Sequence, residues 1–152
     1  MIKRVLFVCY GNACRSPMAE LLFEARISKD QQLRSAGVEV KSAGTDAMLD
    51  AATPEAIAVM AEHGLNLNGH RPVTINRGLA DWADLLLVME VAHKRDVVAL
   101  FPWVKEKVHL LSEYVGDSGE VHDPYSRGIE VYRQCAARLK SLLNKLADKL
   151  KS

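Results

Sequence analysis

The architecture of this chain is set by residues 5–17, which read Val5-Leu6-Phe7-Val8-Cys9-Tyr10-Gly11-Asn12-Ala13-Cys14-Arg15-Ser16-Pro17. The apolar run that ends at Cys9 is typical of a buried parallel strand. A short polar loop follows, and Pro17 then opens a helical pattern for which Ser16 is the expected N-cap. A strand that passes through such a loop into a helix presents backbone N–H groups and a helix N-terminus to an anion. The stretch therefore predicts an oxyanion-binding loop with a thiol at its base.

Apolar strands alternate with helical segments along the rest of the chain. Strands are expected over residues 3–9, 38–41, 84–89 and 107–111, and helices after Pro17, from Thr53, over residues 93–100 and from Gly128 onward. This alternation predicts one α/β domain, residues 1–152, with a four-stranded parallel sheet, helices on both faces and the phosphate-binding loop after the first strand. Ligands of such sheets bind beyond the C-terminal strand ends, where Cys9, Ser42 and Glu90 lie.

The composition is that of an ordinary globular chain. Hydrophobic residues make up 49% and charged residues 26% of the 152 residues, with a formal net charge of +1. We therefore expect neither nucleic acid nor a membrane as partner. No signal-peptide pattern opens the sequence, and no apolar run approaches the ~18 residues of a membrane span. Three cysteines without a disulfide pattern favour a reducing compartment and predict a cytoplasmic location. No spacing of cysteine and histidine residues suggests a metal site.

Cys9 and Arg15 are the reactive pair that the loop predicts. A helix N-terminus and a nearby cation favour a thiolate over a thiol, and the planar guanidinium of Arg15 suits two oxygens of a phosphate. A thiolate that attacks a phosphate ester also needs a proton donor for the leaving oxygen. Asp123, in the segment Val121-His122-Asp123-Pro124-Tyr125, is the candidate, with Tyr125 expected to wall the pocket and desolvate the carboxyl group. The alternative is that Cys9 is an ordinary buried residue at a strand end.

Over essentially its whole length the chain resembles the low-molecular-weight protein tyrosine phosphatases. The resemblance is carried by residues 8–17, Asp123-Pro124-Tyr125, Ser42-Ala43-Gly44-Thr45 and Gly69-His70-Arg71. It implies that Cys9 is a nucleophile forming a cysteinyl-phosphate, that Arg15 stabilises the transition state, and that Asp123 acts as acid and then as base. The implied substrate-binding residues are Tyr10, Gly11, Asn12, Ala13, Cys14, Ser16, Met48 and Tyr125, supported by a hydrogen-bond network of Asn12, Ser16, Ser42 and His70.

The same resemblance implies the partners of the protein. Phosphorylated proteins are the expected substrates, inorganic phosphate the product and an inhibitor, and the chain is expected to be a monomer. No metal or organic cofactor is implied.

Two phosphorylated side chains remain open as the substrate. Met48 or Leu49 stands where the family usually has an aromatic pocket wall, and Ser126 where many tyrosine-directed members have a second aromatic residue. Ala13 matches neither the isoleucine of tyrosine-directed relatives nor the threonine of arginine-phosphatase relatives. Residues 35–38, 52–54, 111–115 and 126–129 look more like the bacterial arginine-phosphatase branch. We expect phosphotyrosine hydrolysis, with phosphoarginine as the alternative.

Three further hypotheses concern redox chemistry at Cys14, arsenate reduction and phosphate binding without turnover. Cys14 predicts a redox response, in which it captures a peroxide-oxidised Cys9 as a disulfide, unless it merely fills space. Cys135 has helical spacing and is expected in the core. An arsenate reductase would need redox cysteines after the third strand, and none lies between Cys14 and Cys135. A phosphate-binding module without turnover would not need the acid Asp123.

Overall fold

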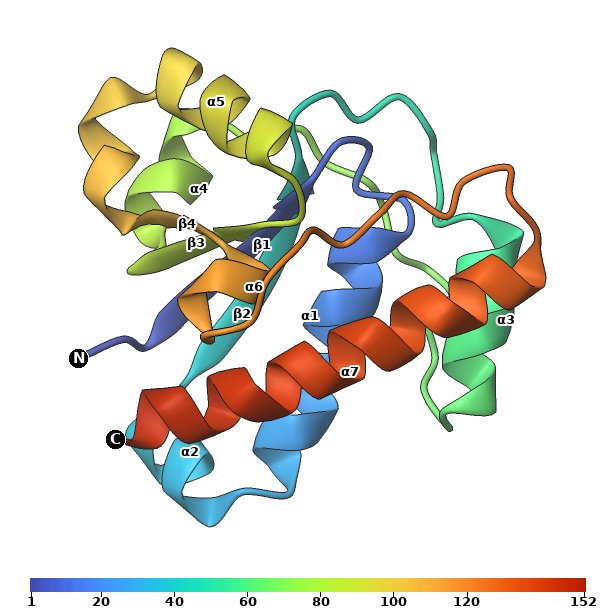
Figure 1. Ribbon diagram of the computed structural model, residues 1–152, viewed down its shortest axis with the longest axis horizontal. Helices are drawn as coiled ribbons and strands as arrows, with labels where there is room; N and C mark the ends of the chain where they lie inside the picture. Colours follow the sequence, from blue (N-terminus) through green and yellow to red (C-terminus); the bar gives the residue numbers. More distant parts are fainter.

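Four parallel strands form the central sheet of the computed structural model, which describes residues 1–152 (Figure 1). The strands are β1 (Arg4–Cys9), β2 (Glu39–Gly44), β3 (Leu85–Val88) and β4 (Val108–Leu110), in the order β2-β1-β3-β4. β1 is central, so that Val8 lies opposite Ala43 on one side and Val88 on the other. Because all four strands are parallel, their C-terminal ends share one edge of the sheet. The predicted single α/β domain with a four-stranded parallel sheet is confirmed.

Helices cover both faces of this sheet, as expected. Figure 1 shows α1, α3 and α7 on one side and α4 and α5 on the other. The helical segments are α1 (Arg15–Ser28), α2 (Gln31–Ala36), α3 (Pro54–Glu62), α4 (Arg77–Trp82), α5 (Val91–Leu100), the 3-10 helix η1 (Pro102–Lys107), α6 (Leu111–Tyr114) and α7 (Ile129–Lys151). None of them is long and apolar enough to cross a lipid bilayer.

Two hydrophobic cores follow from the two-residue period of the strands. In β1, Val5 and Phe7 face the larger core of 28 buried residues, whereas Leu6 and Val8 face the smaller core of 12. The larger core lies under α1, α3 and α7, and fully buried Tyr132 belongs to it. Because both faces are covered there, residues 5–8 of β1 and 85–88 of β3 are apolar at every position.

The structure corrects two expected boundaries next to the loop. β2 extends through Ser42, Ala43 and Gly44, beyond the expected end of the strand at residue 41. α1 begins at Arg15 rather than at Pro17, because the N–H of Met18 already donates to the carbonyl of Cys14 at 3.0 Å. The expectation that Ser16 is an N-cap is therefore wrong. Thr53, by contrast, does cap α3, since its hydroxyl oxygen accepts the N–H of Ala56 at 3.3 Å.

Candidate active site

The loop between β1 and α1 wraps around the thiol of Cys9. The Sγ atom accepts the backbone N–H of Asn12 at 3.3 Å and lies 2.9 Å from the hydroxyl oxygen of Ser16. The end of β2 follows the same loop, because the N–H groups of Thr45 and Asp46 donate to the carbonyls of Cys9 and Tyr10. The thiol is 1% exposed at the base of a hydrogen-bonded ring, where a backbone turn and the start of α1 meet.

Asn12 fixes the conformation of this loop through hydrogen bonds. Its backbone is in the left-handed region (φ 52°), which is uncommon for a residue other than glycine. Its side-chain amide donates to the hydroxyls of Ser16 at 2.8 Å and Ser42 at 2.9 Å. Its carbonyl oxygen accepts His70 Nε2 at 2.9 Å. The structure thus brings together the four residues expected to form the supporting network, and Ser42 in turn donates to Glu20 at 2.6 Å.

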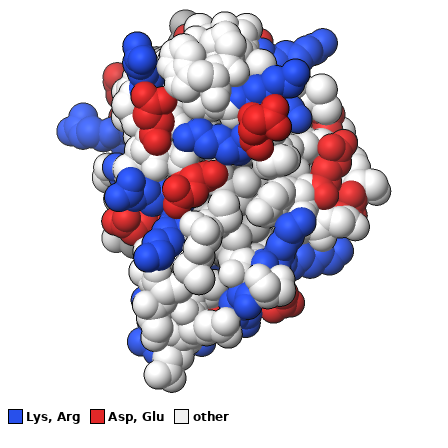
Figure 2. Space-filling view, turned by 90° about the vertical axis from the view of Figure 1, so that its left-hand side faces the viewer, with Lys and Arg blue, Asp and Glu red and all other residues white.

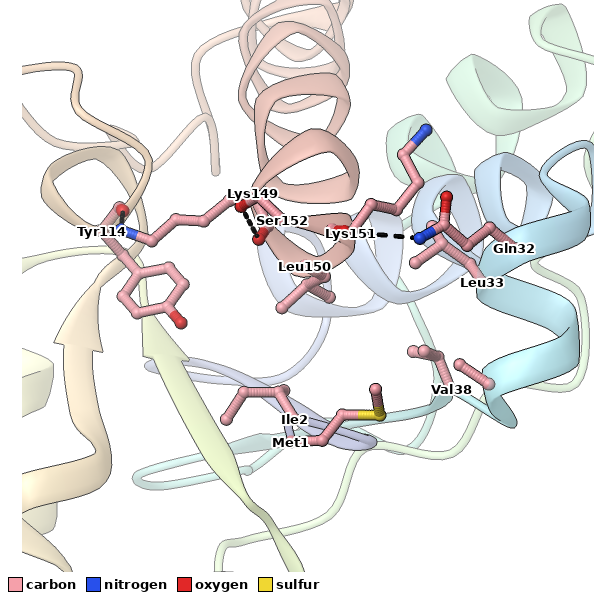
Figure 3. A pocket seen from close by; sticks show the side chains of 11 residues that line it. Met1, Ile2, Gln32, Leu33, Val38, Tyr114, Lys149, Leu150, Lys151 and Ser152 are labelled. Carbon is pink, nitrogen blue, oxygen red and sulfur yellow. Dashed lines mark hydrogen bonds between the residues drawn. The ribbon is translucent and has the colours of Figure 1, made fainter.

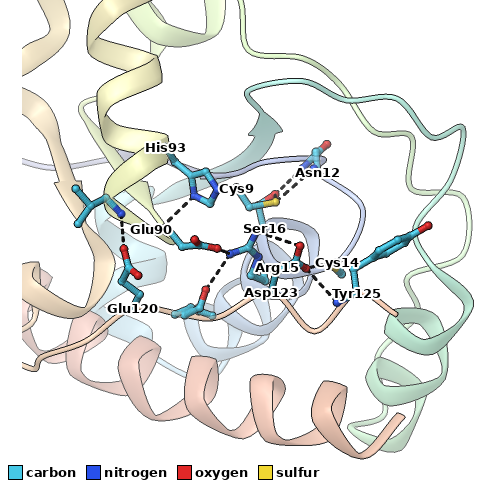
Figure 4. A network of polar contacts seen from close by, with 12 residues as sticks. Cys9, Asn12, Cys14, Arg15, Ser16, Glu90, His93, Glu120, Asp123 and Tyr125 are labelled. Carbon is cyan, nitrogen blue, oxygen red and sulfur yellow. Dashed lines mark hydrogen bonds and ion pairs between the residues drawn. The ribbon is translucent and has the colours of Figure 1, made fainter. Parts of the chain in front are cut away.

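Arg15 is the buried cation beside the loop, with its side chain 3% exposed. Its Nη1 donates to a carboxylate oxygen of Glu90 and to the carbonyl of Val121, the latter at 2.9 Å. Its Nη2 lies 3.8 Å from an oxygen of Asp123. Figure 4 shows the guanidinium between these two carboxylates. Arg15 Nε has no hydrogen-bond partner within the protein, so the guanidinium keeps a donor for an oxyanion.

Glu90 and His93 are site residues to which the sequence assigned no role. Glu90 follows β3, and its backbone N–H donates to Nδ1 of His93 at 3.1 Å. His93 is 4% exposed, and burial, followed by the charge of Arg15, lowers the pKa of its imidazole. The position of Glu90 after a strand placed it at the correct sheet edge, but no motif marked its pairing with Arg15.

Asp123 stands at the mouth of the site on the loop before α7. One of its oxygens accepts the N–H of Tyr125 at 3.1 Å and lies 3.8 Å from the thiol of Cys14. The side chain is 48% exposed, so Tyr125 does not enclose it as expected. A carboxyl group that reaches both the loop and the solvent is able to exchange protons with a leaving group and then with water.

A cavity of about 400 Å³ opens above the thiol. Its lining comprises Cys9, Tyr10, Gly11, Ala13, Cys14, Arg15, Asp46, Met48, Leu49, Asp123 and Tyr125. Two residues expected to bind substrate, Asn12 and Ser16, are fully buried and lie outside this lining. Met48 and Leu49 both line the cavity, where either was expected as the pocket wall. Asp46 was not predicted from the sequence; its carboxylate accepts the hydroxyl of Tyr10 at 3.2 Å. That hydrogen bond raises the pKa of Tyr10.

The two remaining thiols differ in position. Cys14 lines the cavity, and burial raises the pKa of its thiol to about 12. Cys135 lies in the larger core, as expected, and burial likewise raises its pKa to about 12. Both are therefore protonated at neutral pH.

Comparisons with known proteins agree with this geometry. Residues 4–152 match the family described as low molecular weight phosphotyrosine protein phosphatase. A protein-arginine-phosphatase of Geobacillus stearothermophilus is 41% identical over 100% of this chain and 99% of its own. A solved low molecular weight protein tyrosine phosphatase from T. tengcongensis superposes with a TM-score of 0.87 and 40% identity, covering 97% of this chain and 99% of its own. The YwlE arginine phosphatase mutant with a phosphorylated active-site serine superposes with a TM-score of 0.90 and 38% identity, covering 98% and 96%.

Proposed function

The chain belongs to the low molecular weight phosphotyrosine protein phosphatase family, whose members are cysteine-dependent protein phosphatases, and we propose that it hydrolyses phosphotyrosine in proteins through Cys9. The proposal rests on one observation: the thiol of Cys9 lies at the base of a cavity that also holds Arg15 and Asp123. A nucleophile, an oxyanion-binding cation and a proton donor are the groups that the reaction requires.

The first step transfers the phosphoryl group to sulfur. The thiolate of Cys9 attacks phosphorus, while the loop N–H groups and Arg15 bind the non-bridging oxygens. The S–P bond forms as the bond to the tyrosine oxygen breaks, and Asp123 gives its proton to that oxygen. The hydroxyl of Ser16, 2.9 Å from Sγ, supports the thiolate before the attack.

The second step restores the enzyme. Asp123, now a carboxylate, takes a proton from a water molecule that attacks phosphorus on the cysteinyl-phosphate. The S–P bond breaks, inorganic phosphate is released, and the thiolate returns to its contact with Ser16. The phosphorylated active-site serine in the YwlE relative supports a covalent intermediate of this kind.

The walls of the cavity favour an aromatic leaving group. Met48 and Leu49 supply apolar surface, and the rings of Tyr10 and Tyr125 are half exposed in the same lining. Aromatic rings pack well against such side chains, and Ala13 leaves room for a phenyl group.

Phosphoarginine is the second candidate, because the cavity also contains Asp46. A guanidinium group is planar and cationic, and it pairs with carboxylates in a way that a phenyl ring does not. The name of the Geobacillus relative supports the same substrate.

The deciding experiment measures kcat/KM for matched phosphotyrosine and phosphoarginine peptides, with Cys9→Ser as the blank. A preference of about tenfold or more for phosphotyrosine, equivalent to about 1.4 kcal/mol of transition-state binding, supports the first candidate. A preference for phosphoarginine that Asp46→Asn abolishes supports the second. Release of phosphate by Cys9→Ser as fast as by the wild type contradicts the mechanism for either substrate.

We further propose that the chain acts as a cytoplasmic monomer that inorganic phosphate inhibits. The buried free thiols of Cys9, Cys14 and Cys135 support a reducing compartment. The loop that binds a phosphoryl group also fits the product, so phosphate should raise KM without lowering kcat. Sedimentation velocity tests the monomer, and fractionation of cells tests the location.

A further inference from the structure

We propose that His93 is a positioning residue for the phosphatase reaction: its Nδ1 fixes the turn from which Glu90 holds Arg15 in the active site. The inference rests on the proposed function, because Arg15 is the group that binds the reacting phosphoryl oxygens. His93 lies outside the lining of the cavity, so it acts through Glu90 and not on the substrate.

The turn after β3 depends on the imidazole. Glu90 is the residue before α5, with an extended backbone (φ −136°, ψ 155°), and His93 is the third residue of that helix. The N–H of Glu90 donates to Nδ1 of His93 at 3.1 Å, and the N–H of His93 donates to the carbonyl of Glu90 at 3.0 Å. These reciprocal bonds satisfy a backbone donor next to the helix start and set the direction in which Glu90 leaves the strand.

The turn after β3 is hydrogen-bonded both to Arg15 and to the loop that carries Asp123. The carboxylate of Glu90 accepts Arg15 Nη1, and the next N–H, that of Val91, donates to Glu120 at 2.7 Å. Glu120 is three residues before Asp123, on the loop whose Val121 carbonyl also accepts Arg15. Figure 4 shows His93, Glu90, Arg15 and Asp123 as one continuous series of contacts. A shift of the turn therefore moves the cation and disturbs the loop that carries the acid.

The imidazole performs this role only when it is neutral. A ring nitrogen that accepts an N–H carries no proton, so the proton of His93 is on Nε2. The charged groups that act on the ring are Arg15 of α1, Glu90 just before α5, Asp96 of α5 and Asp123 of the loop. Burial and Arg15 oppose a positive charge, the three carboxylates favour one, and the net effect lowers the pKa of His93. Protonation would remove the acceptor and place a second cation beside Arg15.

The test compares His93→Asn with His93→Leu. Asparagine keeps an acceptor at this helix position but does not titrate, whereas leucine has neither property. With an aryl phosphate at pH 7, we expect His93→Leu to lower kcat about tenfold and to change KM by a smaller factor. This loss of kcat corresponds to the free energy of one hydrogen bond. We expect His93→Asn to retain kcat within about threefold, because it restores that bond. The acid limb of its kcat profile should move to lower pH.

His109→Asn is the matched control, because burial also lowers the pKa of His109, which lies in β4 away from the loop. It should leave the acid limb in place. Wild-type kcat in His93→Leu, or an unmoved acid limb in His93→Asn, would overturn the inference, and the second readout decides it even if the leucine variant fails to fold. An inactive wild-type protein would instead overturn the proposed function, and this inference with it.

Discussion

Asn12 shows how much of the active site depends on a single side chain. It is fully buried and strained in the left-handed region, yet every polar atom of its side chain is used. Its amide nitrogen reaches Ser16 and Ser42, and its amide oxygen accepts the N–H of Val73 at 2.9 Å. The hydrogen bonds offset the strain, and they fix the loop before any substrate arrives.

Replacing Asn12 by alanine should therefore affect both stability and activity. The change leaves the Val73 N–H unpaired and keeps the backbone strain, so we expect the free energy of unfolding to fall by about 2–4 kcal/mol. Urea unfolding measures this loss, and kcat/KM should fall with it. Asn66→Ala is the control, because Asn66 is exposed and caps only a turn at Asn68. A midpoint equal to that of the wild type would contradict this account of Asn12.

Cys14 supports a second prediction at this scale. It lines the cavity beside Cys9, and no disulfide joins them. Peroxide should oxidise the Cys9 thiolate to a sulfenic acid, and the other peroxide oxygen should leave as water. The Cys14 thiol should then attack the Cys9 sulfur, so that the sulfenic-acid oxygen leaves as water and a disulfide forms. We expect the wild type to regain activity with a thiol reductant and Cys14→Ser to regain much less. Cys135→Ser should behave as the wild type, and full recovery of Cys14→Ser would refute the protective role.

At the scale of elements, the end of β2 shapes the loop from the side. Gly44 lies opposite Cys9 in the sheet register. A Cβ atom at Gly44 would lie 2.5 Å from the carbonyl oxygen of Tyr10 and 2.9 Å from the nitrogen of Asn12. Both are backbone atoms, so a side chain here requires the loop itself to move.

Gly44→Ala should consequently lower kcat/KM strongly and the free energy of unfolding only moderately. We expect a destabilisation of about 1–3 kcal/mol, typical of overpacking, and a larger loss of kcat/KM as the N–H groups turn away from the phosphoryl site. Thermal unfolding and steady-state kinetics measure the two effects. Gly78→Ala in α4 meets only the side chain of Asn76, at 3.3 Å, and should keep full activity. Wild-type kinetics in Gly44→Ala would show that the loop tolerates displacement.

The elements also show what local sequence can and cannot predict. The strand over residues 5–8 and the long helix from Gly128 were predictable, since apolar runs and helical spacing are local signals. The start of α1 was not, because the hydroxyl of Ser16 bonds to Cys9 and Asn12 in preference to capping a helix. The short helices α2, α4 and α6, of six residues or fewer, have too few turns to show a period.

Within the active site, the loop after β1 was predictable from local sequence, whereas its contact with Glu90 was not. Cys9 and Arg15 were found together because one local motif contains both. Glu90 meets Arg15 only through the pairing of β1 with β3, 75 positions further along the chain. No single-sequence pattern specifies that contact, so the role of His93, which acts through Glu90, was not predictable either.

For the molecule as a whole, the two ends of the chain meet at the edge of the sheet opposite the active site. Figure 3 shows Met1 and Ile2 beside the last turn of α7 at a cavity of about 510 Å³. The ammonium group of Lys151 lies 2.7 Å from Asp30, the N-cap of α2, and Gln32 donates to the carbonyl of Lys151 at 3.3 Å. Elsewhere charges are mixed: Figure 2 shows acidic and basic side chains interspersed over one face.

The pairing of Asp30 should make stability depend on pH. Hydrogen bonds from Lys151 and the N–H of Leu33 lower the pKa of Asp30 from 3.8 to about 2. The unfolded state thus binds the proton more tightly, so this contribution is present above pH 4 and is lost as the pH falls toward 2. Asp30→Asn, which keeps the N-cap acceptor, should lose less stability than the wild type between pH 4 and pH 2 in guanidinium unfolding. Asp148→Asn serves as the control, and parallel pH curves for Asp30→Asn and the wild type would contradict the prediction.

The position of α7 has a consequence for biosynthesis. The strand and loop that carry Cys9 are made first, and α7, which covers the same face of the sheet, is made last. Until Asp123 and α7 have left the ribosome, the loop after β1 lacks its acid and the apolar surface on α1 and α3 stays uncovered. The larger core and the acid Asp123 are therefore completed late in the emergence of this domain, so the site and its cover form together and not segment by segment.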